Sequence, residues 1–220
     1  MSFVDVVEVG GAHVAPEQML RTHHRYFWAE QYCRGSDVLE VGCGSGIGLP
    51  FLKSIARHVE AGDYSEEVLA ICRERHGDIV PLKQFSAEDL PYGDATFDAV
   101  ILFEAMYYIP DVSKFIAECR RVLRPHGVVL IATANNKLFD FTPSPYFTRY
   151  LNVTDFAREF GAEGFAVECF GFISVNQVSL RQKVLRPVKA MASRLNLIPK
   201  SMGGKEWLKK LFFGSLVQMP

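Results

Sequence analysis

The residues with the clearest chemical meaning are four glycines at alternate positions, Gly42, Gly44, Gly46 and Gly48, directly after an apolar run. A dinucleotide-binding turn requires the spacing G-x-G-x-x-G, and neither Gly42 nor Gly44 begins that pattern. Glu40 stands two residues before the first glycine, where its carboxylate would repel a pyrophosphate and attract an ammonium group. We therefore expect this turn to approach a cationic ligand rather than a phosphate.

The stretch that begins at Glu40, E-V-G-C-G-S-G, resembles the first motif of the class I S-adenosylmethionine-dependent methyltransferases. In that family the glycine turn approaches the methionine portion of the cofactor. The resemblance continues at Asp63, where the family's acid binds both ribose hydroxyls, and Tyr64 would lie against the adenine. It implies S-adenosyl-L-methionine as cofactor and S-adenosyl-L-homocysteine as product.

Later segments extend the resemblance. The stretch S-A-E-D-L-P-Y-G-D resembles the family segment that closes over the adenine. The family's usual Asp is Ser86 here, so Glu88 or the backbone of Ala87 is the alternative partner of the adenine amino group. The stretch F-E-A-M-Y-Y-I-P-D resembles a segment of the small-molecule subgroup typified by quinone methyltransferases, with Tyr107 and Tyr108 in place of two common histidines.

The segment H-H-R-Y-F-W-A-E resembles the N-terminal helix that lids the cofactor in related enzymes. Arg25 or Tyr26 in this segment could pair with the methionine carboxylate, with simple helix packing as the alternative. The expected cofactor-binding residues are Arg25, Tyr26, Glu40, Gly42, Cys43, Gly44, Gly46, Asp63, Tyr64, Ser86, Ala87, Glu88 and Phe103.

The acceptor site is harder to predict, because methyl transfer from a sulfonium depends mainly on alignment and exclusion of water. A hydroxyl acceptor would need a general base, and the candidates are Glu104, Tyr107, Tyr108, His23 and His24. For the histidines the alternative is an exposed helix position, and for the tyrosines it is pocket lining. A sugar ring could stack on a wall of Phe139, Phe141, Tyr146, Phe147 and Arg149, with a hydrophobic plug over the sheet as the alternative.

The elements that must position these residues alternate between strand and helix. This pattern predicts an α/β fold with a doubly wound, mostly parallel sheet, Rossmann-like, and helices on both faces. The apolar segment 97–103 is expected at the centre of the sheet, buried on both faces. The expected strands are 37–41, 58–62, 80–84, 97–103, 127–132 and 165–173, with 216–219 as a weak further candidate, and the expected helices are 17–33, 46–57, 66–75, 111–123 and 154–160.

The chain of 220 residues is expected to divide into an N-terminal helical lid (1–34), a cofactor-binding domain (35–175) and a basic helical appendage (176–220). Residues 181–210 contain nine Lys or Arg and one acid, although the whole chain carries a net charge of −1. This tail could contact an anionic substrate or a lipid surface, with a solvated helix face as the alternative.

Composition excludes several other classes. The five cysteines are scattered without a C-x-x-C pair, so neither a disulfide framework nor a metal site is predicted. No apolar stretch is long enough to span a membrane and no signal peptide is recognisable, which favours a cytoplasmic protein. The acidic body does not favour binding to nucleic acid, and no oligomeric state is predicted.

The sequence therefore predicts methylation of a small or medium-sized acceptor, with oxygen methylation of a glycan-related or secondary metabolite as first choice. Carbon methylation of a quinone-like ring is the enzymatic alternative. A protein that binds the cofactor without catalysis is the alternative from a different class.

Overall fold

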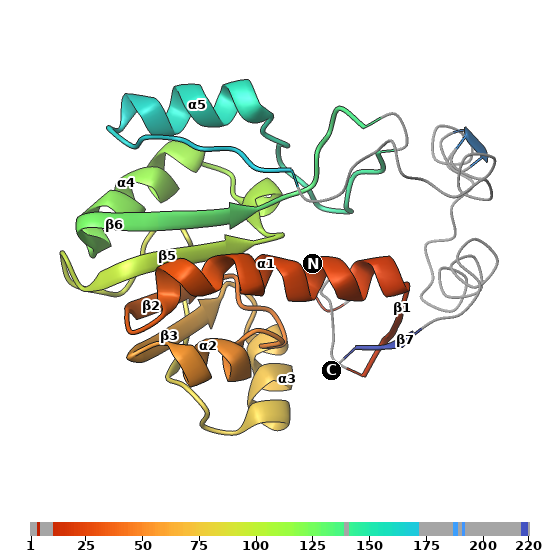
Figure 1. The fold of residues 1–220 in the computed structure, drawn as a ribbon, viewed down its shortest axis with the longest axis horizontal. Helices are drawn as coiled ribbons and strands as arrows, with labels where there is room; N and C mark the ends of the chain where they lie inside the picture. Colours follow the sequence, from red (N-terminus) through yellow and green to blue (C-terminus); the bar gives the residue numbers. More distant parts are fainter. Residues whose placement is uncertain are drawn as a thin grey trace.

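In the computed structural model, the described residues are 11–138 and 141–171, together with residues 4, 187–188, 191 and 217–219. A sheet of five parallel strands has the order β4-β3-β2-β5-β6 (Figure 1). From β2 the chain adds β3 and β4 on one side and then β5 and β6 on the other, so the strand order reverses at a switch point beside β2. In α/β sheets, ligands bind at such a switch point, beyond the carboxyl ends of the strands. The strands are β2 (Asp37–Val41), β3 (His58–Asp63), β4 (Leu82–Gln84), β5 (Phe97–Phe103) and β6 (Leu123–Ala132).

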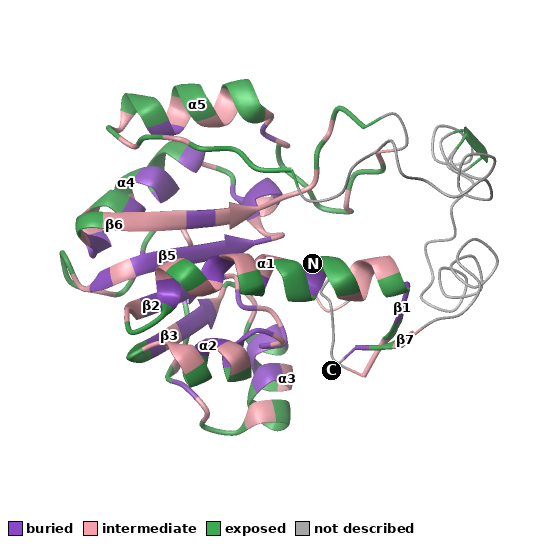
Figure 2. Ribbon diagram, viewed as in Figure 1, coloured by how far each residue is buried: buried purple, intermediate pink, exposed green. Residues whose placement is uncertain are grey.

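Helices cover both faces of this sheet, as predicted. Alternate side chains of a strand point to opposite faces, so Val38 packs with one layer of helices and Leu39 with the other. The first layer contains α1 (Pro16–Cys33), α2 (Leu49–Ile55) and α3 (Glu66–His76), and the second contains α4 (Val112–Val122) and α5 (Val153–Ala162). Figure 2 shows the inner strands buried between these layers.

Local signals in the sequence explain where the helices begin. The Ser65 side chain accepts a hydrogen bond from Val68 N, as expected of the cap of α3. Asn152 caps α5 within a capping box completed by Asp155. The predicted helix from residue 46 begins only at Leu49, because the glycine turn continues through the intervening residues.

The prediction for β5 is partly right. It is buried along most of its length, as its apolar sequence requires. It lies between β2 and β6, however, and the middle strand of the five is β2. Two strands lie on each side of β2, so the switch point falls between β2 and β5, next to the glycine turn.

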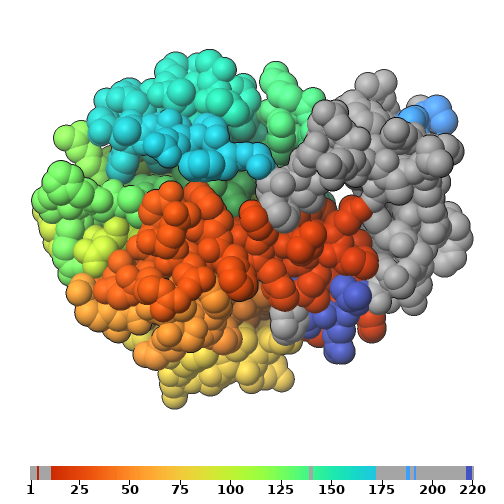
Figure 3. Space-filling model, viewed as in Figure 1, coloured from red at the N-terminus to blue at the C-terminus, as the bar shows by residue number. Residues whose placement is uncertain are grey.

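The predicted strand 165–173 is wrong in its described part. Residues 165–171 form no strand, and the remaining two lie outside the described residues. This segment follows α5 and runs back beside it (Figure 1), and Phe165 and Val167 pack against the core. Phe170 reaches the ring of Trp28 on α1, with ring centroids 5.8 Å apart. Figure 3 shows this segment, in cyan, next to α1, in orange-red.

The weak candidate 216–219 does contain a strand, β7 (Val217–Gln218), but outside the main sheet. It pairs antiparallel with β1 (His13–Val14) in a separate two-stranded sheet. The predicted basic helix of residues 181–210 and the wall residue Phe139 fall outside the described residues, apart from positions 187, 188 and 191. The three-part division of the chain stays a prediction.

Candidate active site

The glycine turn links β2 to α2 and has a backbone that other residues rarely adopt. Gly42, Gly44 and Gly46 have φ values of +66°, +59° and +78°. At Gly48 the constraint is space, because an ideal Cβ would lie 2.0 Å from the Tyr26 ring. Glycine is therefore required for backbone conformation at three positions and for contact with α1 at the fourth.

Amide groups of this turn bond to the protein itself. Cys43 N donates to Gly62 O and Gly46 N donates to Cys43 O, each at 3.0 Å. Gly44 N donates to Asp63 Oδ2, also at 3.0 Å. Phosphate-binding turns leave such amides to the ligand. The arrangement agrees with a turn that does not bind a phosphate.

Glu40 lies on β2 under the turn, and only 2% of its surface is exposed. Its Oε1 accepts a hydrogen bond from the Tyr26 hydroxyl at 2.6 Å, and its Oε2 is buried without a partner among the described residues. Burial raises the pKa of Glu40 to about 7, against the opposing effects of the Tyr26 bond and the Arg25 charge. A buried carboxylate with one unpartnered oxygen suits a cationic donor.

Helix α1 brings two further predicted residues to Glu40. The Tyr26 ring meets the Phe103 ring edge to face, with centroids 5.1 Å apart. The guanidinium carbon of Arg25 lies 6.0 Å from the centre of the same Phe103 ring. These contacts place α1 across the ends of β2 and β5, and its role as a lid stays a prediction. His23 and His24 are exposed on α1.

Asp63 ends the neighbouring strand β3. Its Oδ2 accepts from Gly44 N and its Oδ1 accepts from Ser65 N, each at 3.0 Å. Burial raises the pKa of Asp63, and these backbone hydrogen bonds oppose the shift. Each oxygen keeps a lone pair that could accept from a ligand hydroxyl. Tyr64, beside it, is 67% exposed.

The segment expected against the adenine is fixed to α4. Ser86 Oγ accepts from Glu88 N at 3.1 Å. The Glu88 side chain accepts from Asp111 N at 2.6 Å, just before the first turn of α4. Ala87 packs against the core between them. Glu88 therefore has a structural role that the sequence did not reveal, because its partner lies on a distant segment.

Beyond β5 the structure shows an aromatic cluster, formed by Tyr107, Tyr108, Phe141, Phe147 and Tyr150. Tyr107 stacks on Tyr150 with centroids 4.6 Å apart, and Phe141 and Phe147 contact the same Tyr150 ring. Tyr108 lies against Tyr107, also at 4.6 Å. Tyr150 joins the rings, although the sequence analysis did not single it out.

Glu104 lies at the base of this cluster in a strained backbone conformation. Its φ is +54°, and its N donates to Ala132 O at 2.7 Å. The Tyr107 hydroxyl donates to Glu104 Oε2 at 3.4 Å. Such strain is concentrated at functional sites. The structure thus places a carboxylate and an aromatic surface at the same edge of the sheet as Glu40.

Two residues of the predicted wall, Arg149 and Tyr146, have surroundings that differ from those of Phe141 and Phe147. The Arg149 guanidinium pairs with Asp155 and Glu159 of α5, at 3.3 and 2.8 Å. Tyr146 is largely exposed and has a positive φ of 68°. An arginine bonded to two acids is a poor partner for a substrate diphosphate.

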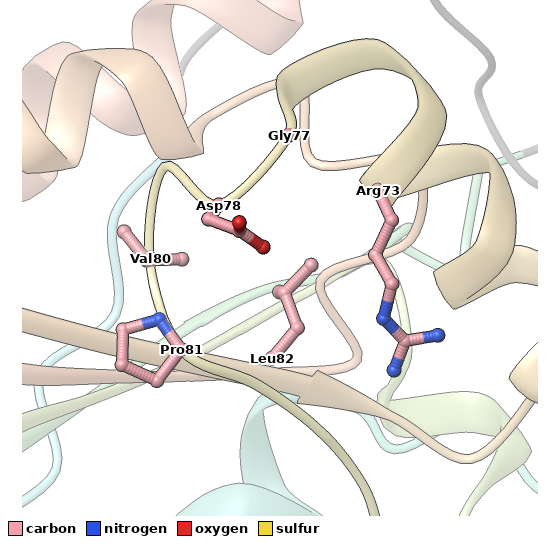
Figure 4. Close-up of a pocket in the computed structure, with 6 residues that line it drawn as sticks. All are labelled: Arg73, Gly77, Asp78, Val80, Pro81 and Leu82. Carbon is pink, nitrogen blue, oxygen red and sulfur yellow. The ribbon is translucent and has the colours of Figure 1, made fainter.

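A pocket of about 270 Å³ lies away from this site (Figure 4). It is lined by Arg73, Gly77, Asp78, Val80, Pro81 and Leu82, between the end of α3 and the start of β4. None of the predicted site residues lines this pocket, although His76, beside Gly77, lies near Gly46 of the glycine turn. In the described part of the chain, no cluster of His, Cys, Asp or Glu could hold a metal ion, and no helix is long and apolar enough to cross a membrane.

A doubly wound parallel sheet with an acid before its glycine turn and a second acid on the next strand is the arrangement expected of a class I S-adenosylmethionine-dependent methyltransferase domain. Residues 39–131 match the family described as "Methyltransferase domain". The chain contains this domain, as the sequence predicted, and S-adenosylmethionine is the cofactor of the class.

Individual relatives agree with this assignment. An S-adenosylmethionine-dependent methyltransferase from Mycolicibacterium smegmatis is 38% identical over 140 residues, covering 62% of this chain and 54% of the relative. A fatty-acid O-methyltransferase from the same organism is 38% identical over 110 residues, covering 48% and 40%. The chain spans about half the length of the curated relatives it matches.

The fold has a solved counterpart in the YcgJ protein from Bacillus subtilis. The TM-score is 0.59 over 84% of this chain and 88% of that one. Because only 19% of residues are identical, this likeness supports the fold alone.

Proposed function

We propose that this chain transfers the methyl group of S-adenosylmethionine to a hydroxyl of a small or medium-sized acceptor, a glycan-related or secondary metabolite. The observation that carries the proposal is the position of Glu104, whose carboxylate lies beside the aromatic cluster and at the edge of the sheet where β2 also ends. An acceptor ring stacked on the cluster would present a hydroxyl to this carboxylate.

The residues present fit the cofactor. Glu40 Oε2 would accept from its ammonium, Asp63 from its ribose hydroxyls, and Arg25 would pair with its carboxylate. Tyr64 would lie against the adenine. When bound, the cofactor supplies a methyl group already activated by its sulfonium. The chain has only to exclude water, align the acceptor and accept a proton.

Glu104 is the best of the predicted bases. Burial raises the pKa of Tyr108, and the negative charge of Glu104 adds to the shift, so Tyr108 stays a neutral phenol. His23 and His24 are exposed on α1. The Glu104 carboxylate would accept the acceptor's hydroxyl proton as the oxygen attacks the methyl group.

Two features bear on the type of acceptor. The tyrosine hydroxyls of the cluster bond to Glu104 and Ser144, so the cluster has polar groups beside its rings, which favours a hydroxylated acceptor over a wholly apolar one. The relative named as a fatty-acid O-methyltransferase supports transfer to oxygen. Carbon methylation of a quinone-like ring is the second candidate, because the stacked Tyr107 and Tyr150 rings would also hold a flat ring. Contact of the basic tail with an anionic substrate or lipid surface remains a further proposal.

The test is transfer of a radiolabelled methyl group to hydroxylated sugars and sugar nucleotides, quinols and hydroxy fatty acids. We expect a methyl ether as product, and a Glu104→Gln variant with kcat lowered about 100-fold but an unchanged affinity for S-adenosylhomocysteine. Glu74→Gln, an exposed position on α3, is the matched control. A carbon-methylated product, or cofactor binding without transfer to any acceptor, would contradict the proposal.

A further inference from the structure

Tyr26 joins the N-terminal helix to the buried strand β2. Its ring is 8% exposed, lies edge to face with Phe103, and packs against Gly48, where no side chain intervenes. Its hydroxyl donates to Glu40 Oε1 at 2.6 Å, a short distance typical of a bond to a charged acceptor. Packing on both sides fixes the ring, so the hydroxyl is held in place by the fold itself.

We propose that Tyr26 is a positioning residue for the cofactor: its hydroxyl holds the Glu40 carboxylate ionised and oriented, with Oε2 left for the cofactor's ammonium. The proposal rests on the proposed role of Glu40. A phenol has one proton, so a hydroxyl that donates to Glu40 does not at the same time donate to the cofactor's carboxylate. Arg25 remains as the partner of that carboxylate, and Tyr26 acts through Glu40.

The groups around Glu40 show why this bond matters. Arg25, Tyr26 and Cys33 face it from α1, Asp63 from β3, Cys43 from the turn and Cys72 from α3. Burial and the Asp63 charge favour the neutral acid, whereas the Tyr26 bond and the Arg25 charge favour the carboxylate. Burial also raises the pKa of Cys33 to about 12, which keeps that thiol neutral. Without the hydroxyl, Arg25 alone opposes burial, and Glu40 stays protonated to a higher pH.

The test compares wild type with Tyr26→Phe, which keeps the ring and removes the hydroxyl. Dissociation constants of S-adenosylhomocysteine are measured by calorimetry from about pH 6 to about pH 9, and the ratio of variant to wild type is plotted. Titration of the ligand's own amine cancels in this ratio. If loss of the bond raises the pKa of Glu40 by about one unit, the ratio is about tenfold near pH 6 and approaches one near pH 9.

Tyr32→Phe is the matched control, because Tyr32 lies on the same helix and packs against Trp28. The ratio of its dissociation constant to that of wild type should stay near one at every pH. A ratio above one that does not change with pH would mean that Tyr26 contacts the cofactor directly, and it would overturn the proposal. A ratio of one at every pH would reduce Tyr26 to a packing residue, with the same consequence.

A second comparison guards against a folding defect. In a Glu40→Gln background no carboxylate at position 40 can titrate, so Tyr26→Phe should then give a ratio that is independent of pH. A ratio that still falls with pH in this background would overturn the proposal. Failure of wild type to bind S-adenosylhomocysteine at any pH would instead refute the proposed function on which this inference rests, so the two failures are distinguishable.

Discussion

The stability of the ligand-free Glu40→Gln variant, compared with that of wild type, should increase as the pH rises. This is expected although the substitution removes a residue of the proposed site. The pKa of Glu40 is raised from its ordinary 4.5 to about 7, mainly by burial. A raised pKa means that the folded protein favours the protonated acid. That contribution to stability is therefore fully present below about pH 4.5 and is lost as the pH rises through about 7.

The magnitude follows from the two pKa values. Integrated from about pH 5 to about pH 8.5, the shift removes about 2–3 kcal/mol from the free energy of unfolding of wild type. Glutamine carries no charge in the folded or the unfolded protein, so the variant loses none of this free energy as the pH rises. The free energy of unfolding of Glu40→Gln minus that of wild type should therefore rise by about 2–3 kcal/mol over the same interval.

Urea unfolding at both pH values measures this difference. The glutamine amide brings a new buried N–H group, but its cost is nearly the same at both pH values and cancels. Glu74→Gln, exposed on α3, should show no such change. The stability of the variant minus that of wild type could instead stay constant with pH, or fall as the pH rises. Either result would show that Glu40 is not a buried carboxylate with a raised pKa, and the argument for a cation site would fail.

Two further predictions concern the glycine turn and its neighbour. Gly48→Ala should lower the free energy of unfolding by about 1–3 kcal/mol, measured by urea unfolding, because its Cβ would lie 2.0 Å from the Tyr26 ring; Gly161→Ala, with no atom within 4 Å, is the control and should not destabilise. Asp63→Ala should weaken binding of S-adenosylhomocysteine in calorimetry by about 2 kcal/mol, and equal affinity in a folded variant would remove Asp63 from the site.

Features set by neighbouring residues could be predicted from the sequence. Largely apolar runs gave the bounds of β2 and β5, because a strand buried on both faces has few polar positions. Ser65 was recognisable as the cap of α3 because a cap depends on residues three positions away. The position of Glu40 before the glycines likewise predicted a carboxylate at the end of a buried strand.

Contacts between distant segments could not be predicted in this way. The Tyr26 hydroxyl meets Glu40 only because α1 crosses the sheet at one angle, and nothing local fixes that angle. The segment 165–171 has the alternating pattern of a strand, but Phe165 and Val167 satisfy it by packing against the core. Periodicity indicates which side chains are buried, not whether the backbone pairs with a neighbouring strand.

The polarity of the site explains why a glycine turn at a switch point serves this cofactor. Anion sites present backbone N–H groups, but here Cys43, Gly44 and Gly46 donate theirs to the protein. In the proposed site, the groups left for the cofactor are acceptors, namely the second oxygen of Glu40 and the remaining lone pairs of Asp63. Phosphate oxygens offer no donors to such groups, whereas an ammonium and a pair of ribose hydroxyls offer several. Because burial and the charge of Asp63 both raise the cost of ionising Glu40, a ligand that brings positive charge relieves a cost already present in the fold.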